Sequence, residues 1–259
     1  MYLLICAGMY VFQGRLLYLP SPDYTASPAD IGLEYEDLTL TAADGVAIAA
    51  WYIPCRSARG HVIFCHGNAG NMADRLTTLG ALHRLGLNVL IFDYRGYGRS
   101  GGSPAEQGTY LDAEAAWNHL IEKRGVSPGT IVIFGRSLGG AVAIELARRR
   151  NPAALVVEST FTNVVDIGRR QYPFLPINLL CRYRYDSLAK VGQLAMPKLF
   201  LHGRDDQLIP IEVGHRLFEA AAEPKQFIET PGGHNFAGFT YTPEYTARLA
   251  LFLDLILGP

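Results

Sequence analysis

Residues 131–144 read Ile-Val-Ile-Phe-Gly-Arg-Ser-Leu-Gly-Gly-Ala-Val-Ala-Ile, an apolar strand that leads directly into the start of a helix. Within this stretch Gly135, Ser137 and Gly139 form a G-x-S-x-G pattern. A strand-to-helix turn this tight holds the serine in a strained conformation, requires small flanking residues, and raises the Oγ atom above the edge of the sheet. The stretch therefore predicts that Ser137 is a nucleophile.

The G-x-S-x-G pattern alone is weak evidence, because chance produces it in roughly one chain of this composition in ten. Residues 98–102, Gly-Arg-Ser-Gly-Gly, match it as well. Ser100 lies among glycines with Pro104 beyond, which is typical of a turn serine. The overlapping G-x-G-x-x-G of residues 96–101 follows a strand, but Pro104 separates it from the helix whose N-terminus would bind a pyrophosphate. A dinucleotide site is therefore disfavoured.

Outward from residues 131–144, short apolar runs alternate with helical stretches from about residue 60 onward, which predicts βαβ units and a parallel sheet. A hairpin, with a turn at residues 43–45, opens the fold. We expect one α/β domain over residues 30–259, with a mostly parallel eight-stranded sheet and helices on both faces. The expected strands are 34–40, 46–53, 61–65, 88–93, 130–134, 154–158, 198–202 and 226–229, and the expected helices lie near 72–85, 106–124, 138–149, 211–222 and 243–257.

The segment 159–192 breaks this alternation, and Pro173 and Pro176 exclude one continuous helix through it. Long insertions in compact domains are usually lids or binding loops. We therefore interpret the segment as a short lid, with Phe161 and Tyr172 as candidate substrate contacts; the alternative is a surface excursion without a role. The segment carries four arginines, at 169, 170, 182 and 184.

Composition narrows the classes of function. The chain has 259 residues, a net charge of −1 and 18% charged residues, so it has no overall positive field that would favour nucleic acid. The four cysteines are far apart and are interpreted as free thiols. Because no His, Cys or carboxylate set has the spacing of metal ligands, we expect neither a metal nor a cofactor.

Residues 1–29 form an apolar N-terminal segment. Its first twelve residues carry no charge, but Arg15 follows too soon for a membrane span of about 20 apolar residues, and the features of a secretory signal are missing. Two interpretations remain: the stub of a longer anchor, or a helix packed on the domain or on the membrane interface. A cytoplasmic and a membrane-associated location both stay open.

A serine needs a base to take its proton. In a doubly wound hydrolase the catalytic order along the chain is serine, acid, histidine. Of the histidines that follow Ser137, His234 lies in a flexible loop, Pro-Gly-Gly-His-Asn over residues 231–235, and is the expected base. Asp205 and Asp206 follow the strand 198–202 and are both candidates for the acid; spacing does not separate them, and Glu158 is a third candidate.

An oxyanion requires fixed N–H donors. The backbone N–H of Leu138 is one, directly after the serine. The second is expected in the glycine-rich loop 65–71, Cys-His-Gly-Asn-Ala-Gly-Asn, at Asn68.

Taken together, His-Gly-Asn-Ala-Gly-Asn at 66–71, Asp-Tyr-Arg-Gly-Tyr-Gly at 93–98, Gly-Arg-Ser-Leu-Gly-Gly at 135–140, His-Gly-Arg-Asp-Asp at 202–206 and Gly-His-Asn at 233–235 resemble the α/β-hydrolase superfamily. The resemblance is to its small serine esterases and acyl-protein thioesterase-like proteins, with serine aminopeptidase relatives, and spans residues 30–257. It implies Asp206 rather than Asp205 as the acid, the N–H groups of Asn68 and Leu138 as the oxyanion hole, and a structural role for residues 93–100. Relatives often carry a hydrophobic N-terminal anchor.

The expected activity is hydrolysis of a small-molecule carboxylic ester of short to medium acyl length, through a Ser137–His234–Asp206 triad and an acyl-enzyme. Acyl-protein thioesterase or lysophospholipase-like activity is the first alternative. A peptidase would use the same machinery, and a catalytically silent scaffold on this fold is the alternative from a different class. The oligomeric state stays open.

Overall fold

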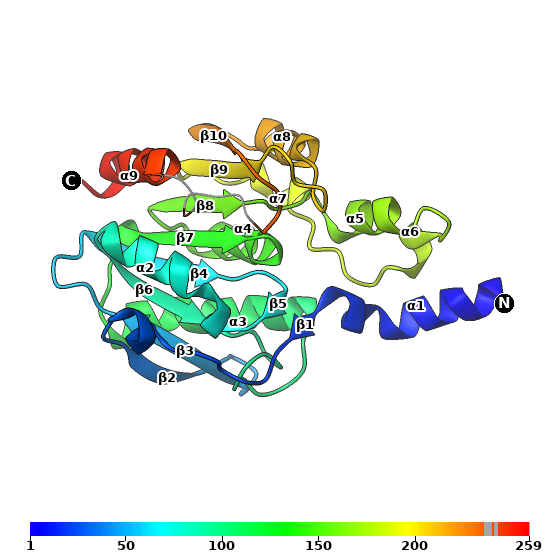
Figure 1. Ribbon diagram of the computed structural model, residues 1–259, viewed down its shortest axis with the longest axis horizontal. Coiled ribbons are helices and arrows are strands. Elements are labelled where there is room, and N and C mark those ends of the chain that lie inside the picture. The colour runs from blue at the N-terminus through cyan, green and yellow to red at the C-terminus, as the bar shows by residue number, and fades with distance from the viewer. Residues whose placement is uncertain (236–239, 241–242, 259) are drawn as a thin grey trace.

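A central eight-stranded sheet organises the chain in the computed structural model, which describes residues 1–235, 240 and 243–258 (Figure 1). The strand order is β10-β9-β8-β7-β4-β6-β3-β2. From β10 to β6 all neighbours are parallel, whereas β3 runs antiparallel to both β6 and β2. The strands are β2 (Glu36–Thr41), β3 (Ala47–Ile53), β4 (Gly60–Cys65), β6 (Leu87–Phe92), β7 (Ile131–Arg136), β8 (Ala154–Glu158), β9 (Lys198–Gly203) and β10 (Lys225–Thr230).

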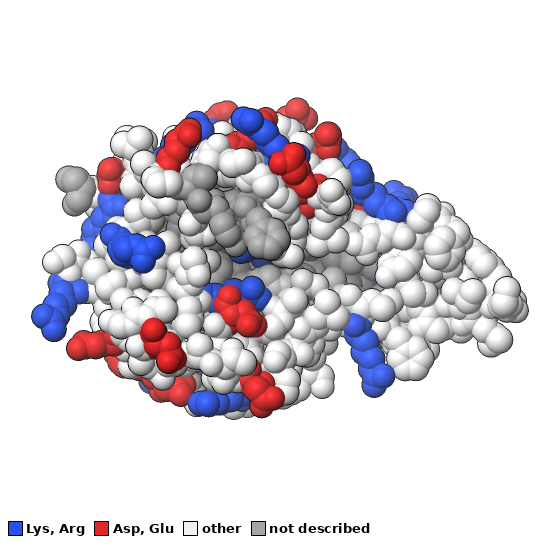
Figure 2. Space-filling view, viewed as in Figure 1, with Lys and Arg blue, Asp and Glu red and all other residues white. Residues whose placement is uncertain are grey.

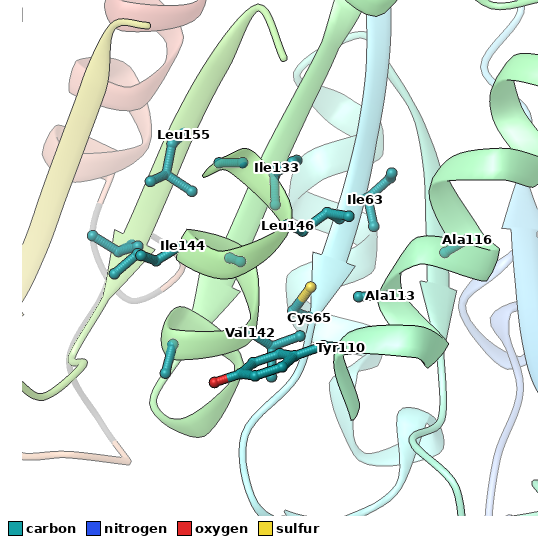
Figure 3. Close-up of a cluster of buried hydrophobic side chains, with 14 of the residues drawn as sticks. Ile63, Cys65, Tyr110, Ala113, Ala116, Ile133, Val142, Ile144, Leu146 and Leu155 are labelled. Atoms are coloured by element: carbon teal, nitrogen blue, oxygen red, sulfur yellow. The ribbon is translucent and has the colours of Figure 1, made fainter. Parts of the chain in front are cut away.

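Successive side chains of a strand point to opposite faces of the sheet, so a continuous apolar strand places apolar side chains on both faces. Helices cover both faces and bury these side chains. In β7, Ile131 and Ile133 pack on one face, under α3 and α4, while Val132 and Phe134 pack on the other, under α2 and α9. Figure 3 shows the first face, where Tyr110 of α3 and Val142 of α4 meet over the strands. The covering helices are α2 (Leu76–Arg84), α3 (Glu106–Asn118), α4 (Leu138–Arg150), α8 (Ile211–Ala220) and α9 (Pro243–Leu257).

The expected α/β architecture with a mostly parallel eight-stranded sheet is confirmed. One expected helix differs, because the α-helix predicted over residues 106–124 ends at Asn118 and continues as a single π-turn, His119–Lys123. A second, two-stranded pairing joins β1 (Leu19–Pro20) to β5 (Ala69–Gly70) and was not predicted. Short 3-10 turns lie at Pro28–Ile31, Met72–Arg75 and Pro128–Thr130.

The segment 159–192 carries three short helices, α5 (Val164–Gln171), α6 (Ile177–Leu180) and α7 (Leu188–Val191). The first two project from the carboxyl end of β8 toward the N-terminal helix, whereas α7 returns to pack beside α4 and α8 (Figure 1). The proline at 173 falls between α5 and α6, as its missing N–H requires.

The N-terminal segment forms helix α1 (Tyr2–Leu17), which extends from the body of the molecule alongside α6 (Figure 1). Cys6 of α1 is buried against Val165, Leu175 and Ile177 of the 159–192 segment. Among the described residues, no helix combines the length and the apolar character that crossing a membrane would need.

Candidate active site

Ser137 occupies the sharp turn between β7 and α4. Its backbone has φ 53° and ψ −120°, a conformation that costs a residue with a Cβ about 1–3 kcal/mol. The turn is held by the Ser137 amide, which donates to the Glu158 carbonyl at 2.9 Å, and by the Thr160 hydroxyl, which donates to the Ser137 carbonyl at 2.8 Å. A Cβ at Gly139 would overlap the Cys65 carbonyl, which explains the glycine of the motif.

A hydrogen-bond chain leads from Ser137 to His234 and on to Asp206, three residues that come from separate loops. The Nε2 atom of His234 lies 3.0 Å from Ser137 Oγ, and its Nδ1 atom lies 2.7 Å from Asp206 Oδ2. Because the buried carboxylate can only accept, Nδ1 carries the proton, which leaves Nε2 to accept the serine hydroxyl. This arrangement can deprotonate Ser137 and stabilise the imidazolium that results.

The two adjacent aspartates point in different directions. Asp206 is buried, and its second oxygen accepts from the N–H groups of Leu208 and Ile209 at 3.0 and 2.8 Å, so the carboxylate is fixed from both ends. The exposed Asp205 instead accepts from the Gly232 amide at 3.3 Å. Asp206 therefore contacts the imidazole of His234. The side chain of Asp205 contacts the backbone of the loop that carries His234.

The third candidate acid, Glu158, is paired with Arg136 at 3.4 Å. Burial raises the pKa of the Glu158 carboxyl, an effect that the Arg136 guanidinium opposes. Arg136 also donates to the backbone carbonyl of His234 at 2.9 Å. The sequence did not indicate this contact, and the only available signal for it is the place of Arg136 beside the serine.

The two other histidines that follow Ser137 have their own partners. His202 is buried and hydrogen-bonds the Ile209 carbonyl at 2.7 Å, and burial lowers its pKa, so the ring stays neutral. His215 on α8 stacks on Phe227.

Asn68 and Leu138 border Ser137 from two sides. Leu138 is the first residue of α4, where the N–H groups have no acceptor within the helix. Gly67, next to Asn68, comes close enough that a Cβ there would lie 3.6 Å from the Ser137 Cβ. Asn68 itself is held firmly: its carbonyl accepts from the Tyr97 hydroxyl at 2.7 Å and from the Leu19 amide at 3.0 Å. Gly67 and Leu138 thus lie directly beside Ser137, and Asn68 is the next residue of the same loop.

The two candidate substrate contacts have different surroundings. Tyr172 lines an apolar cavity between α1 and the 159–192 segment, together with residues of α5 and α6. Phe161 is instead buried in the hydrophobic core, and it is not among the residues that line this cavity. Phe161 therefore packs in the core, whereas Tyr172 borders the cavity.

Ser100, the serine of the second G-x-S-x-G match, lies in a structural turn, as its surroundings in the sequence indicated. The Ser100 hydroxyl accepts from the Ala49 amide at 2.9 Å and donates to the Asp93 carbonyl at 2.8 Å. The carboxylate of Asp93 accepts from the Met72 amide and the Tyr24 hydroxyl. This loop fastens β6 to its neighbours. Within the described part of the chain, no group of three or more His, Cys, Asp or Glu side chains is arranged to hold a metal ion.

Comparisons with known proteins agree with this architecture. Residues 56–175 match the model of a family described as serine aminopeptidase, S33. The chain is 41% identical over 239 residues to the uncharacterized protein Rv2307c of Mycobacterium tuberculosis, covering 90% of this chain and 85% of that protein. It is 36% identical over 256 residues to the alpha/beta hydrolase domain-containing protein WAV2 of Arabidopsis thaliana, covering 88% and 82%.

Among solved structures, the Pyrococcus furiosus esterase Pf2001 superposes with a TM-score of 0.76 at 23% identity, covering 93% of this chain and 98% of that one. This likeness shows the fold, and the relatives in sequence show the family. The chain therefore belongs to the α/β hydrolases.

Proposed function

We propose that the chain is a serine hydrolase that cleaves carboxylic esters of small molecules. The observation that carries this proposal is the hydrogen-bond chain Ser137–His234–Asp206, with its distances of 3.0 and 2.7 Å. Membership of a hydrolase family and a fold shared with an esterase support it at a coarser level.

In the proposed reaction, Ser137 Oγ attacks the acyl carbon while its proton passes to His234 Nε2. The backbone N–H groups of Asn68 and Leu138 bind the oxyanion, each contributing roughly 10²–10³ in rate. The protonated imidazole gives its proton to the departing alcohol, which leaves an ester on Ser137. His234 then deprotonates a water molecule that attacks this ester, and the acid is released with Ser137 restored.

A fluorophosphonate probe tests the proposal, because it forms a covalent adduct only with an activated serine. We expect the wild-type chain to be labelled and to hydrolyse p-nitrophenyl butanoate, and Ser137→Ala to do neither. Ser100→Ala is the matched control, since Ser100 occupies the same motif in a structural turn and should keep both activities. A wild-type chain that folds but neither reacts with the probe nor hydrolyses any ester would support the scaffold alternative instead.

Acyl thioesters and lysophospholipids are the alternative substrates, because the same acyl-enzyme would form from them. An aminopeptidase, by contrast, needs a free carboxylate to bind the substrate's amine. The two carboxylates of the 159–192 segment already have hydrogen-bond partners within the segment. Asp166 accepts from the side chain of Asn163, and the backbone amide of Asp166 donates back to that side chain. Asp186 accepts from the Ala189 amide. This favours an ester over a peptide.

We also propose that α1 brings the molecule to an anionic lipid surface. The support is the exposure of large apolar side chains along the helix, among them Leu3 at 81% and Leu4 at 77%, with Arg15 as its one charged residue. Exposed apolar surface of this extent usually marks an interaction site.

A further inference from the structure

An apolar cavity of about 110 Å³ lies between helix α1 and the 159–192 segment. One wall is formed by the second half of α1, and the opposite wall by α5 and α6, which run beside it in Figure 1. The side chains that matter below are Leu17 of α1, Ile167 of α5 and Leu180 of α6.

Each wall of the cavity is linked to a residue of the candidate active site. On the α1 side, the carbonyl of Leu17 accepts a hydrogen bond from the Asn68 side chain at 2.9 Å, and Asn68 is the proposed oxyanion donor. On the other side, α5 follows closely on Thr160, which hydrogen-bonds the Ser137 carbonyl. The cavity is therefore bounded by one stretch of chain that contacts Asn68 and by another that follows Thr160, the residue bonded to Ser137.

Two polar side chains of the cavity wall, Gln13 and Cys181, are hydrogen-bonded to the backbone. Gln13 donates to the Leu180 carbonyl at 3.1 Å and accepts from the Arg182 amide at 2.7 Å, which also ties α1 to the segment. The Cys181 thiol points to the Tyr183 carbonyl at 3.0 Å, and burial raises its pKa, so that the thiol stays neutral. Most of the lining side chains are apolar, and such a lining favours an apolar guest.

We propose that this cavity binds the acyl chain of the ester, with helix α1 as one of its walls, an inference that rests on the proposed function. An apolar cavity of about 150 Å³ accommodates a benzene ring, so this smaller one suits an acyl chain of about four to six carbons. The N-terminal helix is then a specificity-determining part of the enzyme.

Two neighbouring residues of α6 provide a matched test. Leu180 faces the cavity, whereas Leu179 is 82% exposed. We expect wild type to prefer p-nitrophenyl butanoate and hexanoate to the acetate and the decanoate. Leu180→Trp fills the cavity and should lower kcat/KM for the hexanoate relative to the acetate on the order of tenfold, since each buried methylene contributes roughly fourfold. Leu179→Trp should keep the wild-type profile.

Ile167→Ala, which enlarges the cavity, should move the preference toward longer chains, and it supplies an independent readout if Leu180→Trp folds poorly. Labelling by the fluorophosphonate probe reports the integrity of the reactive serine in every variant. Labelled variants with an unchanged chain-length profile would overturn the acyl-site inference and leave the proposed function intact. A wild-type chain without labelling or hydrolysis would overturn the proposed function itself.

Discussion

At the scale of single residues, burial distinguishes the two adjacent aspartates. The Asp206 carboxylate is excluded from solvent and receives hydrogen bonds from two amides and one imidazole, so its position is fixed. Asp205 is exposed, and its side chain accepts from the Gly232 amide. Of the two aspartates, Asp206 is therefore the one that contacts the His234 imidazole.

Asp206→Asn should lower kcat roughly 10³–10⁴-fold, because an amide can donate to Nδ1 and stabilise the wrong tautomer of the imidazole. Asp205→Asn removes the same charge one position earlier and should leave kcat near the wild-type value. Ester hydrolysis by both variants at matched concentration, with circular dichroism to verify folding, measures the difference. Similar losses in the two variants would show that the negative charge of the loop, rather than the contact with His234, matters.

The candidate site divides into a part that sequence can predict and a part that it cannot. Ser137 is predictable because strand, turn and helix are local features of 14 residues, numbers 131 to 144. His234 is predictable from chain order and a glycine-rich loop. The contact between Arg136 and the His234 carbonyl joins residues 98 positions apart, so it depends on how β7 and the final loop are placed by the whole sheet.

At the scale of elements, helix α4 is fastened to its neighbours by Glu145, whose buried carboxylate pairs with three cations. Arg149 lies 2.6 Å away, Arg148 2.8 Å, and Lys190 of α7 3.0 Å. Burial alone would raise the pKa of this carboxyl, but hydrogen bonds from Arg148, Lys190 and Arg149 outweigh it and lower the pKa to about 2. The cluster ties the helix that follows Ser137 to the end of the 159–192 segment.

Because the pKa of Glu145 is lowered on folding from an ordinary value near 4.5, its ionisation stabilises the folded state above about pH 4.5, and this contribution is lost as pH falls toward 2. Glu145→Gln should therefore reduce the free energy of unfolding by about 3 kcal/mol at pH 7, and less at lower pH. Urea unfolding between pH 3 and 7 measures the change.

Asp37→Asn is the control for this prediction, since Asp37 and Arg99 form an exposed pair worth less than about 1 kcal/mol. A difference between wild type and Glu145→Gln that stays constant with pH would contradict the account.

The elements themselves were predictable where periodicity is strong. The buried strands read as continuous apolar runs because both faces of the sheet are covered, and α9 shows apolar residues at helical spacing. The pairing of β1 with β5 was not predictable, because Leu19–Pro20 and Ala69–Gly70 are each two residues long and carry no pattern. The helices of the 159–192 segment were also missed; α6 is only four residues long, and contacts with α1 support it.

At the scale of the whole molecule, charge and apolar surface are unevenly distributed. Figure 2 shows charged side chains over the body, whereas the end formed by α1 and α6 is almost without charge on this face. Phe174 and Leu179, which lie near α1, are 64% and 82% exposed and extend the apolar surface beyond the helix. Arg182 lies over the Tyr10 ring of α1, which adds positive charge at the same end.

This distribution predicts that the wild-type chain cosediments with vesicles that contain an anionic phospholipid, and less so at high salt, because screening weakens the attraction of its arginines. Leu3→Asp combined with Leu4→Asp should weaken partitioning at least 100-fold, since burying each leucine contributes about 1.5–3 kcal/mol. Leu251→Asp is the matched control, because Leu251 is 64% exposed on α9 at the opposite end of the molecule (Figure 1).

All variants should hydrolyse p-nitrophenyl acetate as wild type does. A chain that ignores vesicles but forms dimers, and becomes monomeric in the double variant, would instead assign the apolar end to a second copy.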